Sequence, residues 1–127
     1  MKVISIKEPF ATLIVKKHKT IETRSWKTSY RGEIYIHASK TMMKEKISEN
    51  AFKYINKEEC HSSEIIGKAN LVDCVEMSPE YIKSINKKEL ELGIYEEGRY
   101  AWILDNVEKI KPIKAKGKLN IWEYKED

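Results

Sequence analysis

Four side chains that can bind or react with a ligand lie within eight residues of the chain. The segment 20–26 alternates in the manner of a β-strand, which places Glu22, Arg24 and Trp26 on one face about 6–7 Å apart, with Lys19 at its start. Such residues are rarely fully buried without partners. Two interpretations stay open: a solvated sheet face with a Glu–Arg pair that contributes about 0–1 kcal/mol, or the floor of a cleft.

On the floor of a cleft, these side chains would recognise a nucleotide. Arg24 would hold a phosphate or a base edge with its fork of N–H groups, and Trp26 would stack on a base. Glu22 would accept a hydrogen bond from an exocyclic amine or orient Arg24. Lys19 would supply a second positive charge.

Other polar side chains are expected at the ends of neighbouring strands. Ser5 and Lys7 end the first predicted strand, beside a helix start whose free N–H groups would attract an anion. His37 and Ser39 end the strand predicted over 32–38. Arg31, just before that strand, is either an exposed turn residue or a clamp on the ligand backbone.

Charge is distributed unevenly along the chain. Residues 1–44 carry a net charge of +7, residues 45–108 of −6 and residues 109–127 of +3, within a total of +4. If the two basic ends meet in the fold, they form a basic face beside an acidic one, which suits a polyanionic partner. The alternative is a bias of composition, because 21 of the 24 basic residues are lysine.

The length and composition exclude several classes of protein. A chain of 127 residues predicts one domain, 1–127. No apolar stretch approaches the roughly 18 residues of a membrane-spanning helix, and we find no signal-peptide cleavage site, so we expect a cytoplasmic protein. Cys60 and Cys74 have no partners at zinc-finger spacing, and phosphate-loop and nucleophile-elbow motifs are missing. We therefore expect neither a metal nor a cofactor.

Hydrophobic periodicity predicts a series of strands and short helices. The expected strands are 2–6, 20–26, 32–38, 65–77 with a bulge or a close backbone approach at Gly67, 99–104, 107–110 and 118–124, and the expected helices are 8–17, 42–59 and 79–86. A turn is expected at 105–106, and 90–98 is an acidic loop or an irregular helix. Ser78 is expected to cap the helix over 79–86, and Trp102, in the apolar run 100–104, is expected in the core. Strands joined by short turns, with helices at the ends of the sheet, indicate a small mixed α+β barrel.

Four stretches of the sequence resemble the ASCH (activating signal cointegrator homology) domain family. They are ISIKEPFATLIVKKHKTIETRSW, YRGEIYIHASK, GKANLVDCVEM and YAWILDNVEKIKPIKAKGKLNIWEY, in the order of the family. The family signature G-x-K-x-x-E-x-R is matched at Lys19, Glu22 and Arg24, whereas Lys17 stands in place of its glycine. The resemblance implies a PUA-like mixed β-barrel with short flanking helices.

The resemblance also implies a function, because the family binds RNA or other nucleic acid in a cleft beside this motif. One bacterial branch consists of amidohydrolases that deacetylate acetylcytidine, with the motif Lys as proton acceptor, a Thr as nucleophile and a downstream Glu as proton donor. Other members are described as metal-dependent ribonucleases. By position, Lys19 matches the Lys, Glu22 occupies the Thr position and Thr23 would face the other way, while Glu89 or Glu91 matches the downstream Glu.

Three functions follow from these patterns. The one that we favour is a binding module for single-stranded RNA, another single-stranded nucleic acid or a modified nucleotide. The alternative is a hydrolase of a modified nucleoside such as acetylcytidine, with Lys19 as base and Glu22 activating water, or a ribonuclease. The third is an interaction module for a protein partner, which predicts an exposed apolar patch.

Overall fold

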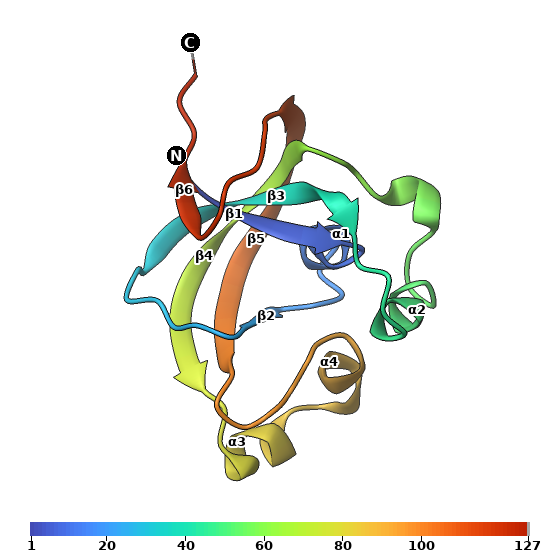
Figure 1. Ribbon diagram of the computed structural model, residues 1–127, viewed down its shortest axis with the longest axis vertical. Coiled ribbons are helices and arrows are strands. Elements are labelled where there is room, and N and C mark those ends of the chain that lie inside the picture. Colours follow the sequence, from blue (N-terminus) through green and yellow to red (C-terminus); the bar gives the residue numbers. More distant parts are fainter. Residues whose placement is uncertain (127) are drawn as a thin grey trace.

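A mixed sheet of six strands forms the centre of the fold in the computed structural model, which describes residues 1–126 (Figure 1). The strands are β1 (Lys2–Glu8), β2 (Ile21–Arg24), β3 (Gly32–Met42), β4 (Glu64–Glu76), β5 (Tyr100–Lys114) and β6 (Ile121–Glu123). They lie in the order β2-β5-β4-β3-β1-β6, with β1 and β3 parallel and the other neighbours antiparallel. The α+β class predicted from the sequence is confirmed.

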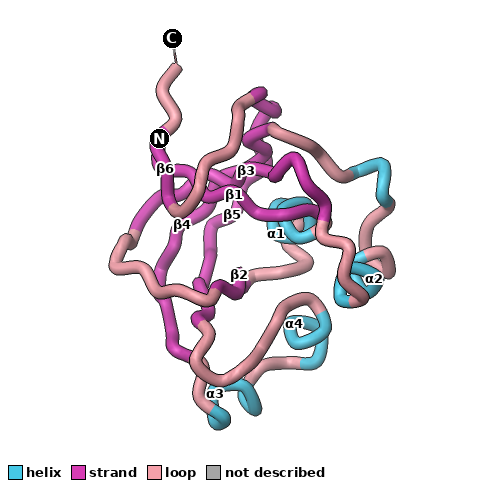
Figure 2. Tube along the Cα trace, in the orientation of Figure 1, coloured by secondary structure: helices cyan, strands magenta, loops and turns pink. Residues whose placement is uncertain are grey.

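Short helices flank the sheet (Figure 2). They are α1 (Phe10–Val15), α2 (Ile47–Ala51), the 3-10 helix η1 (Lys57–Glu59), α3 (Pro79–Ser84) and α4 (Lys87–Glu91). As predicted, Ser78 caps α3, because its hydroxyl oxygen accepts a hydrogen bond of 3.1 Å from the N–H of Tyr81. Among residues 1–126, every helix is too short or too polar to span a bilayer.

The main core lies between the sheet and α1, whose six residues are all buried. Ile34 of β3 and Leu13 of α1 are fully buried there, and Trp102 of β5 is 1% exposed, which confirms its predicted core position. Gly67 lets α1 approach β4 closely, since an added Cβ would lie 2.7 Å from Cγ2 of Val15. The strand register shifts beside Gly67, so the predicted bulge is present.

The expected barrel is not closed, which corrects the prediction from the sequence. β2 and β6 are the edge strands, and within residues 1–126 they do not pair with each other. The long strands β4 and β5 curve, with several register shifts between them, and bring β2 opposite β1 (Figure 1). Arg24 spans the remaining gap, because its Nη2 donates a hydrogen bond of 2.6 Å to the main-chain oxygen of Ser5. A side chain, rather than strand pairing, therefore joins β2 to β1.

The helix predicted over 42–59 is wrong. β3 continues to Met42, and the chain then forms only α2 and η1 in this segment. The hydroxyl of Ser48 donates to the carbonyl three residues earlier, and the Asn56 side chain caps η1. Such local bonds compete with a continuous helix. The apolar stripe is nevertheless buried where the chain passes the core, as Ala51 shows.

The turn predicted at 105–106 is also wrong, because β5 runs unbroken through this position. Lys68 pairs with Glu108 and Asn70 pairs with Asp105, so two residues of β5 lie opposite one residue of β4. The extra residue on β5 forms a bulge. The second residue of the expected turn adopts a φ of +49° within the bulge. Asparagine tolerates this conformation better than most residues, so an Asp-Asn pair suits a bulge as well as a turn.

The end of α1 sets the position of Lys19. The N–H of Lys17 donates to the oxygen of Ile14 and the N–H of His18 to the oxygen of Leu13, both at 2.9 Å, which is the bonding pattern of a Schellman helix end. Lys17 has a φ of +67°, a conformation that favours glycine. It occupies the position at which the signature G-x-K-x-x-E-x-R has glycine, so this turn forms at a cost in backbone strain.

We expect Lys17→Gly to raise the free energy of unfolding by about 1 kcal/mol. Glycine has no Cβ to clash in the left-handed conformation, and this gain exceeds the extra freedom of the unfolded chain. Urea denaturation checks the prediction. Lys17→Ala is the matched control, because it removes the same charge and keeps the Cβ, and it should gain less. Equal midpoints for the two variants would contradict the strain at this position.

Candidate functional site

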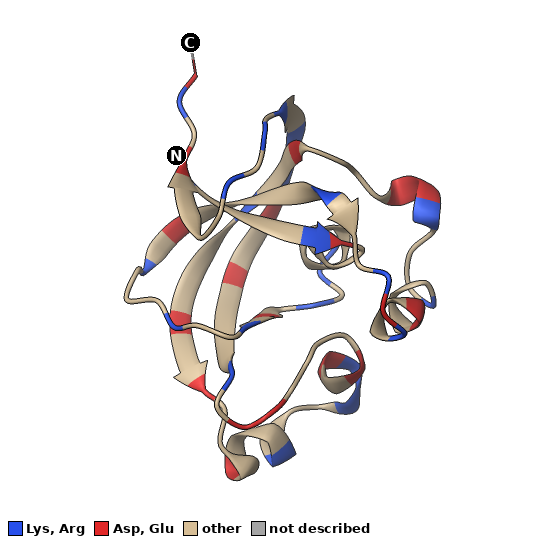
Figure 3. Ribbon diagram, viewed as in Figure 1, with Lys and Arg blue, Asp and Glu red and all other residues tan. Residues whose placement is uncertain are grey.

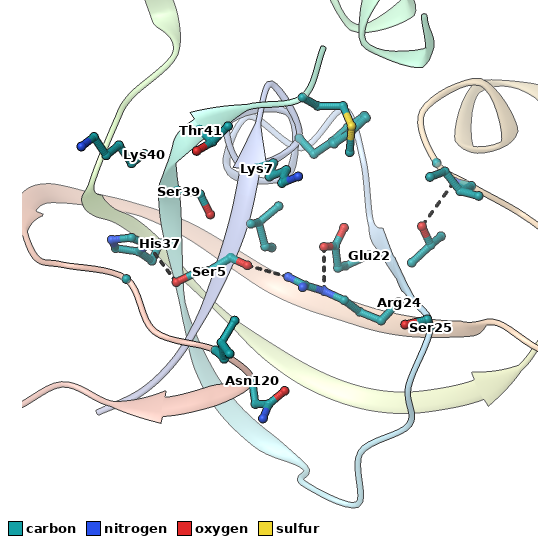
Figure 4. A pocket seen from close by; sticks show the side chains of 18 of the residues that line it. Ser5, Lys7, Glu22, Arg24, Ser25, His37, Ser39, Lys40, Thr41 and Asn120 are labelled. Carbon is teal, nitrogen blue, oxygen red and sulfur yellow. Dashed lines mark hydrogen bonds and ion pairs between the residues drawn. The ribbon is translucent and has the colours of Figure 1, made fainter. Parts of the chain in front are cut away.

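A cavity of about 680 Å³ lies where the ends of β1 and β3 face β2 (Figure 4). Besides these strands, its walls come from residues 25–26 after β2, from the loop 92–94 and from the loop 116–120. The cavity is therefore built from segments that are distant in the sequence.

Eight of the nine side chains singled out from the sequence line this cavity. They are Ser5, Lys7, Lys19, Glu22, Arg24, Trp26, His37 and Ser39. Arg31 is not among the lining residues. Its Nη1 donates to the main-chain oxygens of Thr28 and Tyr30 at 3.0 and 2.8 Å, and its Nη2 lies 3.6 Å from Oδ1 of Asp73. Arg31 thus holds the loop before β3, and we remove it from the candidate site.

Glu22 and Arg24 form an ion pair on the floor of the cavity (Figure 4). Nε of Arg24 lies 3.1 Å from Oε2 of Glu22, although the angle is not that of a hydrogen bond. The two side chains are only 10% and 24% exposed. They therefore line a cleft and not a solvated sheet face, and water screens their charges less than it would on an open surface.

Lys19 is buried beside this pair. The residue is 1% exposed, and its Nζ has no hydrogen-bond partner among residues 1–126. Nζ lies 5.6 Å from the centre of the Phe10 ring, and a Cβ added to Gly93 would stand 3.1 Å from it. Burial lowers the pKa of Lys19, and the negative charges of Glu22 and Glu89 offset this in part. The amine therefore releases its proton more readily than an exposed lysine does.

Trp26 forms part of the wall next to Arg24. Its half-buried indole packs edge to face against Trp102, with ring centres 4.7 Å apart and an angle of 85° between the planes. The Trp102 Nε1–H also donates to the main-chain oxygen of Trp26 at 3.3 Å. The core residue Trp102 therefore holds Trp26 in place at the edge of the cavity.

His37 is fully buried, and both ring nitrogens have partners. Nε2 lies 2.7 Å from the oxygen of Ala115, and Nδ1 lies 3.0 Å from the hydroxyl of Ser5, which also accepts from Nε1 of Trp122 at 3.0 Å. A carbonyl oxygen only accepts, so Nε2 is the donor in the contact with Ala115, and the second ring nitrogen is occupied by the Ser5 hydroxyl. His37 therefore ties the chain after β5 to β3 and β1, and it is not free to act as a base.

A family model described as the ASCH domain matches residues 4–114. The chain belongs to the ASCH domain family. The solved ASCH structure from Zymomonas mobilis has a TM-score of 0.60 at 24% identity, over 89% of this chain and 72% of that one. The structure of a Tyr-to-Phe mutant of the Zymomonas protein has a TM-score of 0.57 at 21% identity, over 89% of this chain and 74% of that one. These likenesses show a shared fold. A search of curated proteins found no significant match.

Of the two candidates for the downstream Glu of an ASCH amidohydrolase, Glu89 is the one whose charge acts on Lys19. It is 6% exposed, and its Oε1 accepts from both the N–H and the hydroxyl of Thr20, at 2.7 and 2.8 Å. Its Oε2 has no hydrogen-bond partner within the described residues. Glu89 therefore fastens α4 to the chain that carries Lys19.

The acidic segment 90–98 covers one side of the cavity of this ASCH domain. Residues 92–94 line it, whereas no glutamate of the segment does so within the described part of the chain. The N–H of Ile94 donates to Oγ1 of Thr23 at 3.3 Å, and Nε of Arg99 donates to the oxygen of Ile94 at 3.1 Å. Hydrogen bonds to its backbone thus hold the segment beside the cavity, and its small and apolar residues line the cavity wall.

The lining of the cavity is strongly basic. It contains seven Lys or Arg residues and one acidic residue, Glu22, in a chain with 24 basic and 20 acidic residues. Basic residues mark the end of β1 and the loop between β5 and β6 (Figure 3). Lys116 and Lys118 on that loop were not singled out from the sequence. The sequence feature that could have indicated these two lysines is the positive charge of both ends of the chain, because the two basic segments meet at the cavity.

The residue types that commonly hold metal ions are dispersed. No three His, Cys, Asp or Glu side chains are grouped to hold a metal ion in the described range 1–126. Cys60 and Cys74 are free thiols in different parts of the chain. Burial, together with the charge of Glu8, raises the pKa of Cys60 to about 11, so this residue is a thiol at neutral pH.

Proposed function

We propose that this ASCH domain binds single-stranded RNA by taking one unpaired or modified nucleotide into the cavity. The observation that carries the proposal is the excess of seven basic residues over one acidic residue in the lining. Such a concentration of positive charge attracts phosphate groups. The cavity of about 680 Å³ has the size of a small-molecule pocket, so it suits one nucleotide rather than a longer stretch of chain. The proposal keeps the PUA-like relationship that the sequence resemblance implies.

The floor of the cavity offers complementary contacts for a base and its phosphate. Oε2 of Glu22 faces Arg24, which leaves Oε1 to accept from an N–H of the base. Arg24 donates one N–H to the main-chain oxygen of Ser5 and forms an ion pair with Glu22, and its remaining N–H groups can donate to a phosphate. Trp26 presents a fixed ring surface against which a base can pack.

Anisotropy of a labelled single-stranded RNA, measured at two salt concentrations, tests the proposal. We expect affinity to fall with salt, with a slope of about 0.7 per phosphate neutralised, because bound counterions are released. The variant with Lys19→Ala and Arg24→Ala should not bind measurably. The RNA is examined afterwards, and intact RNA separates binding from ribonuclease activity. A folded wild-type protein that binds no RNA would refute the proposal.

A second candidate function is hydrolysis of a modified nucleoside, and the burial of Lys19 favours it. Burial lowers the pKa of the Lys19 amine, so this amine can accept a proton at a lower pH than an exposed lysine can. In this reaction Glu22 would orient a water molecule, and Lys19 would take a proton from it while its oxygen attacks the acyl carbon. The bond between that carbon and the amino nitrogen of the base would then break, and Lys19 would return the proton to the nitrogen, which leaves a carboxylic acid and the deacylated nucleoside. Mass spectrometry of acylated nucleosides after incubation tests it. Turnover by the wild type that Lys19→Ala abolishes would support this function, and equal turnover by both would contradict it.

A further inference from the structure

An exposed leucine stands at the mouth of the cavity. Leu119 is 88% exposed, whereas the other exposed large apolar residues of the described chain, Phe52, Val72 and Leu90, reach 38, 47 and 36%. Leu119 also lines the cavity, and Lys116 and Lys118 line it with Leu119 from the same loop. A ligand that covers such an exposed apolar side chain removes its surface from water, and this burial stabilises the complex. Its place beside two cations of the same loop indicates that the ligand is both apolar and anionic.

The loop that carries Leu119 is fastened at both ends, while the side chains of residues 116–120 make no hydrogen bond or ion pair within residues 1–126. At its start, the N–H of Ala115 donates to the oxygen of Ser63 at 3.0 Å, and the oxygen of Ala115 accepts from His37. At its end, the chain enters β6, which pairs with β1. The loop is therefore a fixed support for side chains that are free to bind.

Gly117 brings this loop close to the sheet. A Cβ at this position would lie 2.8 Å from Cε1 of His37 and 3.0 Å from Oγ of Ser5. Figure 1 shows the chain after β5 passing back across β3 and β1 before it enters β6. The loop can lie against these strands because no side chain intervenes at Gly117, and this contact directs its neighbours outward, to the rim of the cavity.

We propose that Leu119 is a wedge that packs against the nucleotide next to the one in the cavity. Lys116 and Lys118 hold the two phosphates that flank this neighbouring nucleotide. A base that enters the cavity leaves its stack, and an apolar side chain can occupy the vacated space. A free nucleoside inside the cavity has no neighbour for Leu119 to contact. The ligand is thus a nucleotide within an RNA strand. This inference rests on the proposed RNA binding and specifies its substrate.

The test compares a 12-nucleotide RNA of random sequence with an equal mixture of the four ribonucleoside monophosphates as ligands. We expect Leu119→Ala to weaken RNA binding at least about fivefold, since apolar area stays in water. The dependence on salt should not change, because no charge is lost. The affinity for the monophosphates should fall much less than that for the RNA, because they lack the neighbouring nucleotide. Val72→Ala is the matched control, because Val72 is an exposed apolar residue of β4 outside the cavity lining.

The lysines have a different expected signature. Lys116→Ala with Lys118→Ala should lower the slope of affinity against salt by about 1.4 units, which is the release expected for two phosphates of a single strand. Lys109→Ala with Lys111→Ala is the control, because both lysines are exposed on β5 and outside the lining. RNA affinity that is unchanged in Leu119→Ala, or lost equally for monophosphates, overturns the wedge. If wild type binds RNA through Arg24 but not Leu119, only the wedge fails. If wild type binds no RNA, both proposals fail.

Discussion

Replacing Arg24 with alanine should weaken RNA binding by about 5- to 150-fold, which corresponds to the roughly 1–3 kcal/mol of a charge-assisted contact. The guanidinium lies on the cavity floor, where it is 24% exposed and keeps N–H groups free of its partners Ser5 and Glu22. A phosphate bound there is partly shielded from water, so its loss costs more than the loss of a surface contact. Arg24→Lys should recover only part of the affinity, because an ammonium cannot form the two-pronged contact.

Arg31→Ala is the matched control for this experiment. Arg31 carries the same charge, but it is bonded to its own loop and lies outside the cavity lining. Its removal changes the net charge equally and should reduce affinity only slightly. Circular dichroism and thermal unfolding establish that both variants fold. Equal losses in the two variants would mean that RNA responds to the total charge of the protein and not to the cavity.

The second large effect is a gain of stability on removal of a buried side chain of the candidate site. Lys19→Met should raise the free energy of unfolding at neutral pH by about 1–4 kcal/mol, because a buried charged group with incomplete partners is replaced by an apolar one of similar length. Glu22 keeps its ion pair with Arg24, and Glu89 keeps both bonds from Thr20, so neither carboxylate is left without a partner. The variant should at the same time lose RNA binding, and any hydrolase activity.

The pH dependence of stability distinguishes this explanation from a general improvement in packing. Burial lowers the pKa of Lys19 in the folded protein below its ordinary value of 10.5. Between the folded and unfolded pKa values the unfolded chain binds more protons, so the stability of the wild type rises with pH across this window. Below both values the cost of the buried charge is present in full. Lys19→Met should lack the rise.

Urea denaturation of both proteins at several pH values up to 10 measures this difference. Lys7→Met is the control, because Lys7 is an exposed lysine on the rim of the same cavity. We expect its stability to follow that of the wild type at every pH. A Lys19→Met protein that is less stable than the wild type would mean that the ammonium contributes more through Glu22 and Glu89 than its burial costs.

Local patterns in the sequence predicted much of the fold because they reflect forces that act over a few residues. The Ser78 cap of α3, the bulge at Gly67 and the burial of Trp102 were all found where capping, chain geometry and hydrophobicity placed them. Errors arose where two local patterns looked alike. The helix predicted over 42–59 failed because an apolar stripe can be buried along an interrupted chain as well as along a helix.

The sequence by itself determined which residues share one face of β2, because alternation along the strand directs Glu22 and Arg24 to one side whatever the rest of the fold does. Only the tertiary structure decided that Lys19 is buried, that His37 is a bonded support and that Arg31 lies elsewhere. It also decided that the loop 116–120 reaches the rim. These properties depend on which distant segments of the chain come into contact. The curvature of the sheet and the gap between β2 and β1 determine those contacts, and no short stretch of sequence encodes them.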